Sequence, residues 1–171
     1  MNLISPVLKG ARIRLRPHRA DDFESLAHIY STDRSKFIDG PKPRDAVWQS
    51  FAADAGQWVL LGFGSWAIED QSSGTYIGQT GLNFPVNYPE RELGWVLFQG
   101  FEGKGYAFEA ACLARAFALE TLGWDGCVSY IDPENHRSIR LAERLGAVRD
   151  ETAATPNGDP CLVYRHTRVL T

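Results

Sequence analysis

The sequence lacks most features that mark secreted, membrane-spanning or nucleic-acid-binding proteins. Its three cysteines, Cys112, Cys127 and Cys161, are odd in number and far apart, which argues against a disulfide framework and against a zinc site. No apolar run approaches the ~18 residues of a membrane span, and the first residues do not resemble a signal peptide. There is no basic stripe, and the net charge is −3. We therefore expect a cytoplasmic protein that holds no metal and binds neither nucleic acid nor membranes.

The composition is that of an ordinary globular protein. Hydrophobic residues make up 44% and charged residues 23% of the 171 positions. There is no internal repeat and no low-complexity linker that would separate two units. We therefore expect a single domain over residues 1–171, a length that suits one sizeable core.

The pattern of apolar residues predicts an α+β fold. Alternating or continuous apolar runs predict strands at residues 11–16, 65–69, 76–84, 91–98, 127–131, 147–151 and 161–169. Helical spacing predicts helices at residues 23–30, 44–60, 106–122 and from Asp132-Pro133-Glu134 to about Gly146. Consecutive strands in the middle favour antiparallel pairing, whereas the strand–helix–strand order after Phe98 favours a parallel crossover. The last two strands are expected to pair across the Asn157-Gly158 turn.

The segment Glu102–Ala107, with the sequence EGKGYA, lies between a predicted strand and a helix rich in alanine and leucine. Glycines at a helix N-terminus let backbone N–H groups approach an anion closely, and phosphate is the usual ligand of such a turn. The turn is not a P-loop, because Lys104 is followed by Gly105 and not by serine or threonine. It is not a dinucleotide fingerprint, because Phe108 stands where the third glycine is needed. By itself the segment is equally compatible with an anion site and with an ordinary helix start.

Two blocks of sequence surround this glycine turn. The first runs from Glu92–Leu97 (ELGWVL) through the turn to Glu109-Ala110 (EA), and the second comprises Ile131–Ser138 (IDPENHRS) and Leu141–Ala147 (LAERLGA). Together they closely resemble the GNAT family of N-acetyltransferases. The opening RIRLRP, which begins at Arg12, is similar to the branch that acetylates the N-termini of ribosomal proteins. The resemblance covers nearly the whole chain in the right order.

The resemblance implies a GNAT fold, in which a mixed and mostly antiparallel sheet of about seven strands is flanked by about four helices. It implies acetyl-CoA as co-substrate and a primary amine as acceptor, either a protein N-terminus or a small molecule. Homodimers are common in the family. The residues expected to bind the CoA pyrophosphate are Gly103, Lys104, Gly105, Tyr106 and Ala107. The backbone of Leu97 is expected to bind the pantetheine arm, and Asn135 and Ser138 match positions that contact this arm and its sulfur.

Direct acetyl transfer to an amine requires a base for the amine and a proton for the thiolate. Glu92 is the candidate base, acting directly or through water; alternatively it is a solvent-facing or salt-bridged strand residue or an anchor for the substrate ammonium. Ser138 is the candidate proton donor, because Ala142 stands where many relatives carry a tyrosine. Helix capping is the alternative interpretation of both Asn135 and Ser138, since both residue types are favoured at helix starts.

Other positions concern the phosphate turn and the acceptor. Glu102 stands where the family has glutamine or arginine, and Phe108 where relatives often have threonine. Tyr30, Phe37 and Trp48 are expected to line the acceptor pocket, because the first two helices cover it in the family. A scatter of acids favours a cationic acceptor: Asp21, Asp22, Glu24, Asp33, Asp39 and Asp45.

Two other functions fit parts of the pattern. A non-catalytic acyl-CoA-binding module would keep the glycine turn but lack a working acid and base, and Ala142 favours this alternative. A scaffold or interaction domain gives no reason for the glycine turn and the second block to occur together. The expected function is therefore N-acetyl transfer from acetyl-CoA to an amine that the sequence does not name.

Overall fold

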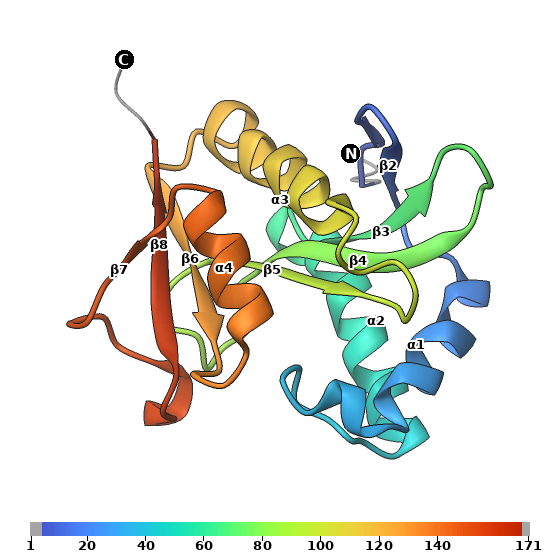
Figure 1. Cartoon of the computed structure of the whole chain (residues 1–171), viewed down its shortest axis with the longest axis horizontal. Coiled ribbons are helices and arrows are strands. Elements are labelled where there is room, and N and C mark those ends of the chain that lie inside the picture. The colour runs from blue at the N-terminus through green and yellow to red at the C-terminus, as the bar shows by residue number, and fades with distance from the viewer. Residues whose placement is uncertain (1–4, 169–171) are drawn as a thin grey trace.

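One mixed β-sheet forms the centre of the computed structural model, which describes residues 5–168 (Figure 1). Within these residues eight strands lie in the order β1-β2-β3-β4-β5-β6-β8-β7. Their bounds are β1 Leu8–Lys9, β2 Ile13–Arg16, β3 Ser65–Asp70, β4 Tyr76–Asn83, β5 Glu92–Leu97, β6 Gly126–Ile131, β7 Val148–Arg149 and β8 Leu162–Thr167. All neighbours are antiparallel except β5 and β6, which are parallel. The predicted fold class is confirmed, and the short β1 adds one strand to the expected number.

Helices cover both faces of this sheet. The described chain contains α1 Phe23–Tyr30, α2 Arg44–Leu61, α3 Tyr106–Ala116 and α4 His136–Arg144, and a π-helical turn at Phe117–Thr121 extends α3. Leu93 of β5 is fully buried in the cluster that includes α3. Alternate residues of a strand face opposite sides, so Val96 and Phe98 pack instead against α1 and α2. Glu92 lies an even number of positions from Val96 and therefore also faces α1 and α2.

Strands β5 and β6 separate after a short contact. Within residues 5–168 they are aligned at one position, Glu92 with Val128, where the Val128 N–H donates to the Arg91 carbonyl at 3.0 Å. Beyond it the strands diverge, and Figure 1 shows β6, β8, β7 and α4 on one side and β2–β5 with α1 and α2 on the other. The Arg91 carbonyl points towards β6, and the direction of main-chain groups alternates along a strand. The main-chain groups of Trp95 and Leu97 therefore point into the opening. This opening is the natural place for a ligand to meet the sheet.

Strand β4, which pairs with the side of β5 away from the opening, carries a bulge. The register between β3 and β4 shifts so that Ile77 has no partner on β3. A Cβ atom on Gly78 would lie 2.2 Å from the carbonyl oxygen of Val96. Glycine is therefore required at this position for β4 to approach β5 this closely.

Helix α4 begins later than predicted. The Asp132 carboxylate accepts the Glu134 N–H at 2.8 Å and closes a tight turn before the helix. Asn135 is the N-cap, and its side chain accepts the Ser138 N–H at 3.2 Å. The prediction that Asp132-Pro133 opens the helix was wrong, because the Asp132 side chain stabilises a turn instead. The predicted end near Gly146 is confirmed, since α4 ends at Arg144.

The C-terminal part of the sheet agrees with the sequence pattern. Strands β7 and β8 pair antiparallel as predicted, and β8 also pairs with β6. Val169, at the predicted end of the last strand, lies outside the described residues. All three cysteines are free. No helix in residues 5–168 combines the length and apolar character that crossing a membrane requires.

Candidate active site

A pocket of about 1230 Å³ opens beside the glycine turn, bounded by β5, α4 and the short helical turn Asp33–Ser35. Leu97 lines it from β5, and Gly103, Gly105 and Ala107 line it from the turn and the start of α3. Its charged lining residues are the cations Arg34, Lys36, Arg137, Arg140 and Arg144 and the anions Asp33, Glu102 and Glu134. Because cations predominate, we call it the basic pocket.

The glycine turn directs backbone N–H groups to the basic pocket. Gly103 and Gly105 have φ angles of 75° and 84°, in the left-handed region that favours glycine. Gly105 is the N-cap of α3, and the Glu109 N–H donates to the Gly105 carbonyl at 3.1 Å. The N–H groups before Glu109 therefore have no partner within the helix, and the positive end of the helix dipole lies with them. Such an arrangement is suited to an anion.

Lys104 and Tyr106, both predicted to bind phosphate, direct their side chains away from the basic pocket. Lys104 Nζ donates to the Gly100 carbonyl at 2.7 Å, and the Lys104 carbonyl accepts from Arg12 Nη1 at 2.8 Å. The Arg12 guanidinium lies 4.8 Å from the centre of the Tyr106 ring. The two side chains therefore brace the turn, and at these positions it is the main chain that a ligand would contact.

Glu102 holds cations at the mouth of the basic pocket. Its carboxylate accepts the Gly100 N–H at 2.9 Å, forms an ion pair with Arg34 and lies 4.0 Å from Arg137. Arg140 has no hydrogen bond or ion pair within residues 5–168, so its charge is available to a ligand. The pocket thus combines backbone donors with exposed cationic side chains.

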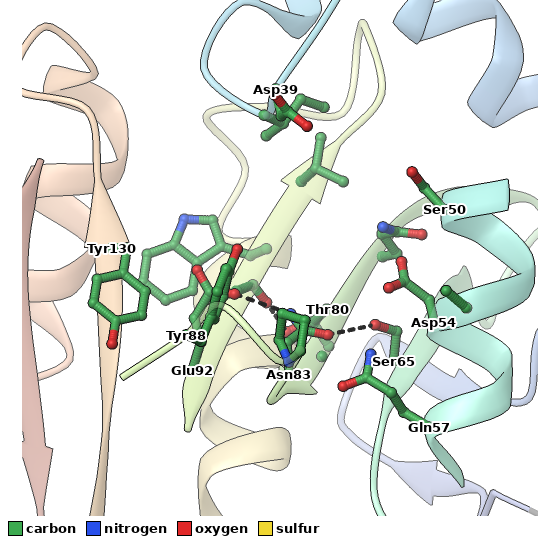
Figure 2. A pocket seen from close by; sticks show the side chains of 18 of the residues that line it. Asp39, Ser50, Asp54, Gln57, Ser65, Thr80, Asn83, Tyr88, Glu92 and Tyr130 are labelled. Carbon is green, nitrogen blue, oxygen red and sulfur yellow. Dashed lines mark hydrogen bonds between the residues drawn. The ribbon is translucent and has the colours of Figure 1, made fainter. Parts of the chain in front are cut away.

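A second pocket, of about 1100 Å³, lies between α2, β4 and β5 (Figure 2). Its charged lining residues are Asp39, Lys42, Asp54 and Glu92. Lys42 Nζ lies 2.6 Å from Asp39 Oδ2, so these two charges are paired. Asp54 extends from α2 towards the part of the pocket where Glu92 projects from β5 (Figure 2). We call this the acidic pocket.

Glu92 is held by a short chain of hydrogen bonds. Ser65 Oγ donates to Asn83 Oδ1 at 3.2 Å, and Asn83 Nδ2 donates to Glu92 Oε2 at 3.1 Å (Figure 2). Burial raises the pKa of Glu92 from 4.5 to about 7, with a further contribution from the negative charge of Asp54. Within residues 5–168 Glu92 forms no ion pair, so the salt-bridged alternative does not apply. A carboxylate with this pKa can accept a proton near neutral pH.

Asp54 is the second carboxylate of the acidic pocket. Burial raises its pKa from 3.8 to about 6, an effect that the nearby charge of Lys42 partly offsets. Within the described chain Asp54 makes no hydrogen bond or ion pair. The pocket therefore holds two carboxylates whose charge no cation among residues 5–168 neutralises at contact.

The basic and acidic pockets meet at the opening between β5 and β6. Residues that line both are Phe37, Ile38, Trp95, Val96, Asn135 and Ser138. Trp95 Nε1 donates to Ser138 Oγ at 3.2 Å, which leaves the hydroxyl hydrogen of Ser138 free to donate elsewhere. Asn135 caps α4, as its alternative interpretation proposed, and also lines both pockets. Ala142 is fully buried in a cluster with Ile131 and Tyr164, against which Trp95 packs.

The sequence profile of the acetyltransferase (GNAT) domain matches residues 12–148, which is most of the chain. The chain belongs to the GNAT acetyltransferase family. Membership of this family supports acetyl transfer with acetyl-CoA as the co-substrate.

Similar proteins support the same family. YkkB, an uncharacterized protein of Bacillus subtilis strain 168, is 31% identical over 161 residues, which are 90% of this chain and 91% of YkkB. The crystal structure of an acetyltransferase from Agrobacterium tumefaciens C58 is 38% identical, with a TM-score of 0.92 and 95% of each chain covered. A protein of Bordetella pertussis, named as a GNAT-family acetyltransferase, is 27% identical, with a TM-score of 0.79 over 95% of this chain and 99% of that one. A Vibrio cholerae structure named for ribosomal-protein serine acetylation is 23% identical, with a TM-score of 0.76 over 96% of this chain and 98% of that one, and shows the fold alone.

In this GNAT acetyltransferase, Asp54 is a site residue that the sequence predictions missed. Val47, Phe51 and Trp58 are buried along one stripe of α2, and Asp54 occupies the same stripe at helical spacing. An acid in an apolar stripe is a visible signal, because that position is normally apolar. The sequence prediction considered only the apolar residues of this helix, so it did not identify Asp54.

The cations of the basic pocket were missed as well. Arg137, Arg140 and Arg144 recur every three or four residues of α4 and line one side of the pocket of this GNAT acetyltransferase. The spacing was readable in the sequence. That these side chains face the glycine turn was not, because it depends on how α4 packs.

The acceptor-side predictions for the GNAT pocket hold in part. Tyr30 and Phe37 line the acidic pocket. Trp48 does not; its ring lies 5.0 Å from that of Phe23, and it is 49% exposed. Of the six scattered acids, Asp39 lines the acidic pocket, and it is paired with Lys42. The negative charge of the pocket comes instead from Asp54 and Glu92, which are not among those six acids.

Proposed function

We propose that this acetyltransferase transfers the acetyl group of acetyl-CoA directly to the nitrogen of a primary amine held in the acidic pocket. The observation that carries the proposal is the meeting of two pockets of opposite charge at Trp95, Asn135 and Ser138. A polyanionic donor and a cationic acceptor approach the same point from opposite sides. Positioning of this kind supplies a large part of a rate enhancement.

The donor is held mainly by main-chain groups. In the proposal, the pyrophosphate accepts from N–H groups in the segment Gly103–Ala107, whose left-handed glycines permit the close approach. Exposed arginines such as Arg140 add charge around the phosphates. The pantetheine arm runs along the free edge of β5 at Leu97 and reaches Asn135 and Ser138 at the junction.

Glu92 is the proposed base. An alkyl ammonium has a pKa of ~10.4, so it must lose a proton before its nitrogen can attack the thioester. Glu92 faces the acidic pocket and has a pKa of about 7, so it is ionised and basic enough to accept that proton, directly or through one water. Asn83 fixes the orientation of the carboxylate.

The other two steps take place at the junction. The attacking nitrogen forms its bond to the thioester carbon, and the developing oxyanion accepts from a main-chain N–H on the free edge of β5, for which Leu97 is nominated. The C–S bond then breaks, and the thiolate takes a proton from Ser138 Oγ. Trp95, which donates to the same oxygen, stabilises the alkoxide character that develops on Ser138. Ser138 recovers a proton from the attacking nitrogen, which must lose its second proton to become the amide.

A non-catalytic acyl-CoA-binding protein is the second candidate. The observation that favours it is Ala142, which stands where many relatives carry a tyrosine and has no side-chain proton to donate. The two candidates agree on the basic pocket. They differ on whether Glu92 acts as a base and Ser138 as a proton donor.

The test combines binding and turnover. Calorimetry with acetyl-CoA is expected to show binding in the micromolar range, and absence of binding at high micromolar ligand contradicts both candidates. Release of free CoA thiol is then measured with a panel of small amines and N-terminal peptides. Thiol release that requires an amine establishes the enzyme, and binding without release under any acceptor establishes the non-catalytic alternative.

Four finer expectations stay predictions. They are membership of the ribosomal-protein N-terminal branch, a single domain over the whole chain, a homodimer and a cytoplasmic location. Turnover of a peptide N-terminus in the same panel tests the branch, and light scattering tests the dimer. Limited proteolysis and cell fractionation test the other two.

A further inference from the structure

No contact within residues 5–168 explains why a carboxylate occupies position 54. Asp54 belongs to the stripe of α2 that buries Val47, Phe51 and Trp58, where an apolar residue would pack at no electrostatic cost. Within residues 5–168 it has no hydrogen-bond donor and no ion-pair partner. The side chain is only partly exposed to solvent, and an unpaired carboxylate in such a position is unfavourable. A ligand cation would remove that cost.

Gln79 supplies an independent indication of a missing donor. Its Oε1 atom is completely buried at the wall of the acidic pocket and has no hydrogen-bond partner in the described chain. Buried polar atoms are nearly always hydrogen-bonded, so this oxygen also calls for a donor from a ligand or a water. A protonated amine brings up to three N–H donors and a positive charge to the same pocket.

The charge balance of the pocket specifies how many cations the ligand carries. Lys42 is the cation that lines the pocket, and its charge is already paired with Asp39 at 2.6 Å. Asp54 and Glu92 remain, and they project from α2 and β5 into one pocket (Figure 2). No unpaired cation of the described lining is left for a substrate carboxylate, so an amino acid or an acidic peptide does not fit.

The lining of the acidic pocket suits an aliphatic spacer. The aromatic residues of the lining are Tyr30, Phe37, Phe84, Tyr88, Trp95 and Tyr130. Aromatic faces contact methylene groups and attract ammonium groups through their quadrupoles. The pocket therefore combines acidic positions on two elements with aromatic surface in its lining.

We infer that the acceptor is a dication, such as an α,ω-diaminoalkane, with one amino group at Glu92 and a second cationic group at Asp54. This inference rests on the proposed N-acetyltransferase function. The amino group at Glu92 gives up its proton and forms the bond to the acetyl carbon while the C–S bond of the donor breaks. The group at Asp54 stays protonated throughout and takes no part in the bond changes; its contact positions the reacting nitrogen.

The experiment compares acceptors that differ only in the second charge. Thiol release is measured for α,ω-diaminoalkanes of increasing length, for alkylamines of the same length and for the matching ω-amino acids. At the best length, kcat/KM for the diaminoalkane is expected to exceed that for the alkylamine by roughly tenfold to a hundredfold, with the amino acid poorest of the three. Equal values for diaminoalkane and alkylamine at every length overturn the inference.

A matched pair of variants assigns the preference to one residue. Asp54→Asn is expected to lower kcat/KM for the diaminoalkane to that of the alkylamine, while Asp45→Asn keeps the preference. Asp45 lies on the exposed part of the same helix, lines neither pocket and carries the same charge. Retention of the full preference in Asp54→Asn overturns the inference. The comparison of acceptors uses the unaltered protein, so the inference stays testable even if a variant folds poorly.

Failure of the proposed function is distinguishable from failure of this inference. Turnover of alkylamines without a preference for diaminoalkanes leaves the proposed function intact and overturns the inference that the acceptor is a dication. If acetyl-CoA binds but no amine is turned over, the proposed function fails, and calorimetric titration with the diaminoalkanes then decides. Saturable binding that Asp54→Asn weakens supports the dication site, and absence of binding overturns it.

Discussion

The basic and acidic pockets handle charge in different ways although they share Trp95, Asn135 and Ser138. In the basic pocket the cations are exposed; the side chain of Arg137, for example, is 77% exposed. Solvent screens such charges, and much of the binding falls to the main chain of the glycine turn. In the acidic pocket the two carboxylates are buried enough to raise their pKa values. A single substitution is therefore expected to matter more in the acidic pocket than in the basic one.

The largest effect is expected for Glu92→Gln, which keeps the shape of the side chain and removes the base. We expect kcat/KM to fall by roughly 10²–10⁴-fold, the usual range for a general base, while the Kd of acetyl-CoA stays within about twofold. Steady-state kinetics and calorimetry measure the two quantities. Glu120→Gln, on the exposed end of the helical segment after α3, is the control. Full activity in Glu92→Gln would falsify the assignment of the base.

The pH dependence of the unaltered enzyme is expected to show the same carboxylate. Glu92 must be ionised to accept a proton, so kcat/KM should fall about tenfold per pH unit below an apparent pKa of about 7. Measurement with a fixed diaminoalkane between about pH 5 and pH 8.5 covers this limb. A limb centred instead near 4.5, the ordinary pKa of glutamate, means that Glu92 is not the titrating base.

A smaller loss is expected at the junction for Ser138→Ala. The thiolate is a moderately good leaving group with a pKa near that of cysteine, ~8.5, so loss of its proton donor should lower kcat only about tenfold. The KM of acetyl-CoA is expected to stay nearly constant, and Ser138→Thr should restore most of the rate. Unchanged kcat in Ser138→Ala assigns the proton to water or another group.

The basic pocket is expected to respond less. Arg140→Ala should raise the KM of acetyl-CoA by roughly three- to tenfold without lowering kcat, and the difference should shrink as salt is added. Arg149→Ala is the matched control, because Arg149 is exposed and lines neither pocket. If Arg140→Ala lowered kcat as much as Glu92→Gln does, the contrast between the two pockets would be contradicted.

The smallest effect is expected on the stability of Asp54→Asn. This substitution should raise the stability of the protein although it lowers activity with diaminoalkanes. The pKa of Asp54 is raised from 3.8 to about 6, so the folded protein binds this proton more tightly than the unfolded chain does. The stability that the group contributes below pH 3.8 is therefore lost as the pH rises through about 6. At pH 8 Asp54→Asn removes that cost and should raise Tm by about 2–6 °C, whereas Asp45→Asn should not. Thermal melts at pH 8 measure the difference, and a lower Tm for Asp54→Asn contradicts an unpaired carboxylate.

The sequence alone determined the fold class, the glycine turn and the ends of several elements, because those features depend on local chemistry. Apolar periodicity reports which face of a strand or helix is buried. Gly103 and Gly105 mark a turn because other residues rarely adopt its left-handed φ angles. The start of α4 was misplaced because Asp132 and Asn135 are both good caps, and only the packed turn decides between them.

Tertiary structure decided what each polar residue of the site does. Lys104 and Tyr106 match the phosphate motif, yet Arg12 and Gly100 hold the Lys104 carbonyl and side chain, and Arg12 lies over the Tyr106 ring. Asp54 and Glu92 lie far apart in the sequence, and they face one pocket only because α2 packs against the side of β5 that carries Glu92. The pKa of a carboxylate depends on burial and on charges that distant segments bring near it. No local pattern carries that information, so the charge of the acceptor pocket emerges only from the folded chain.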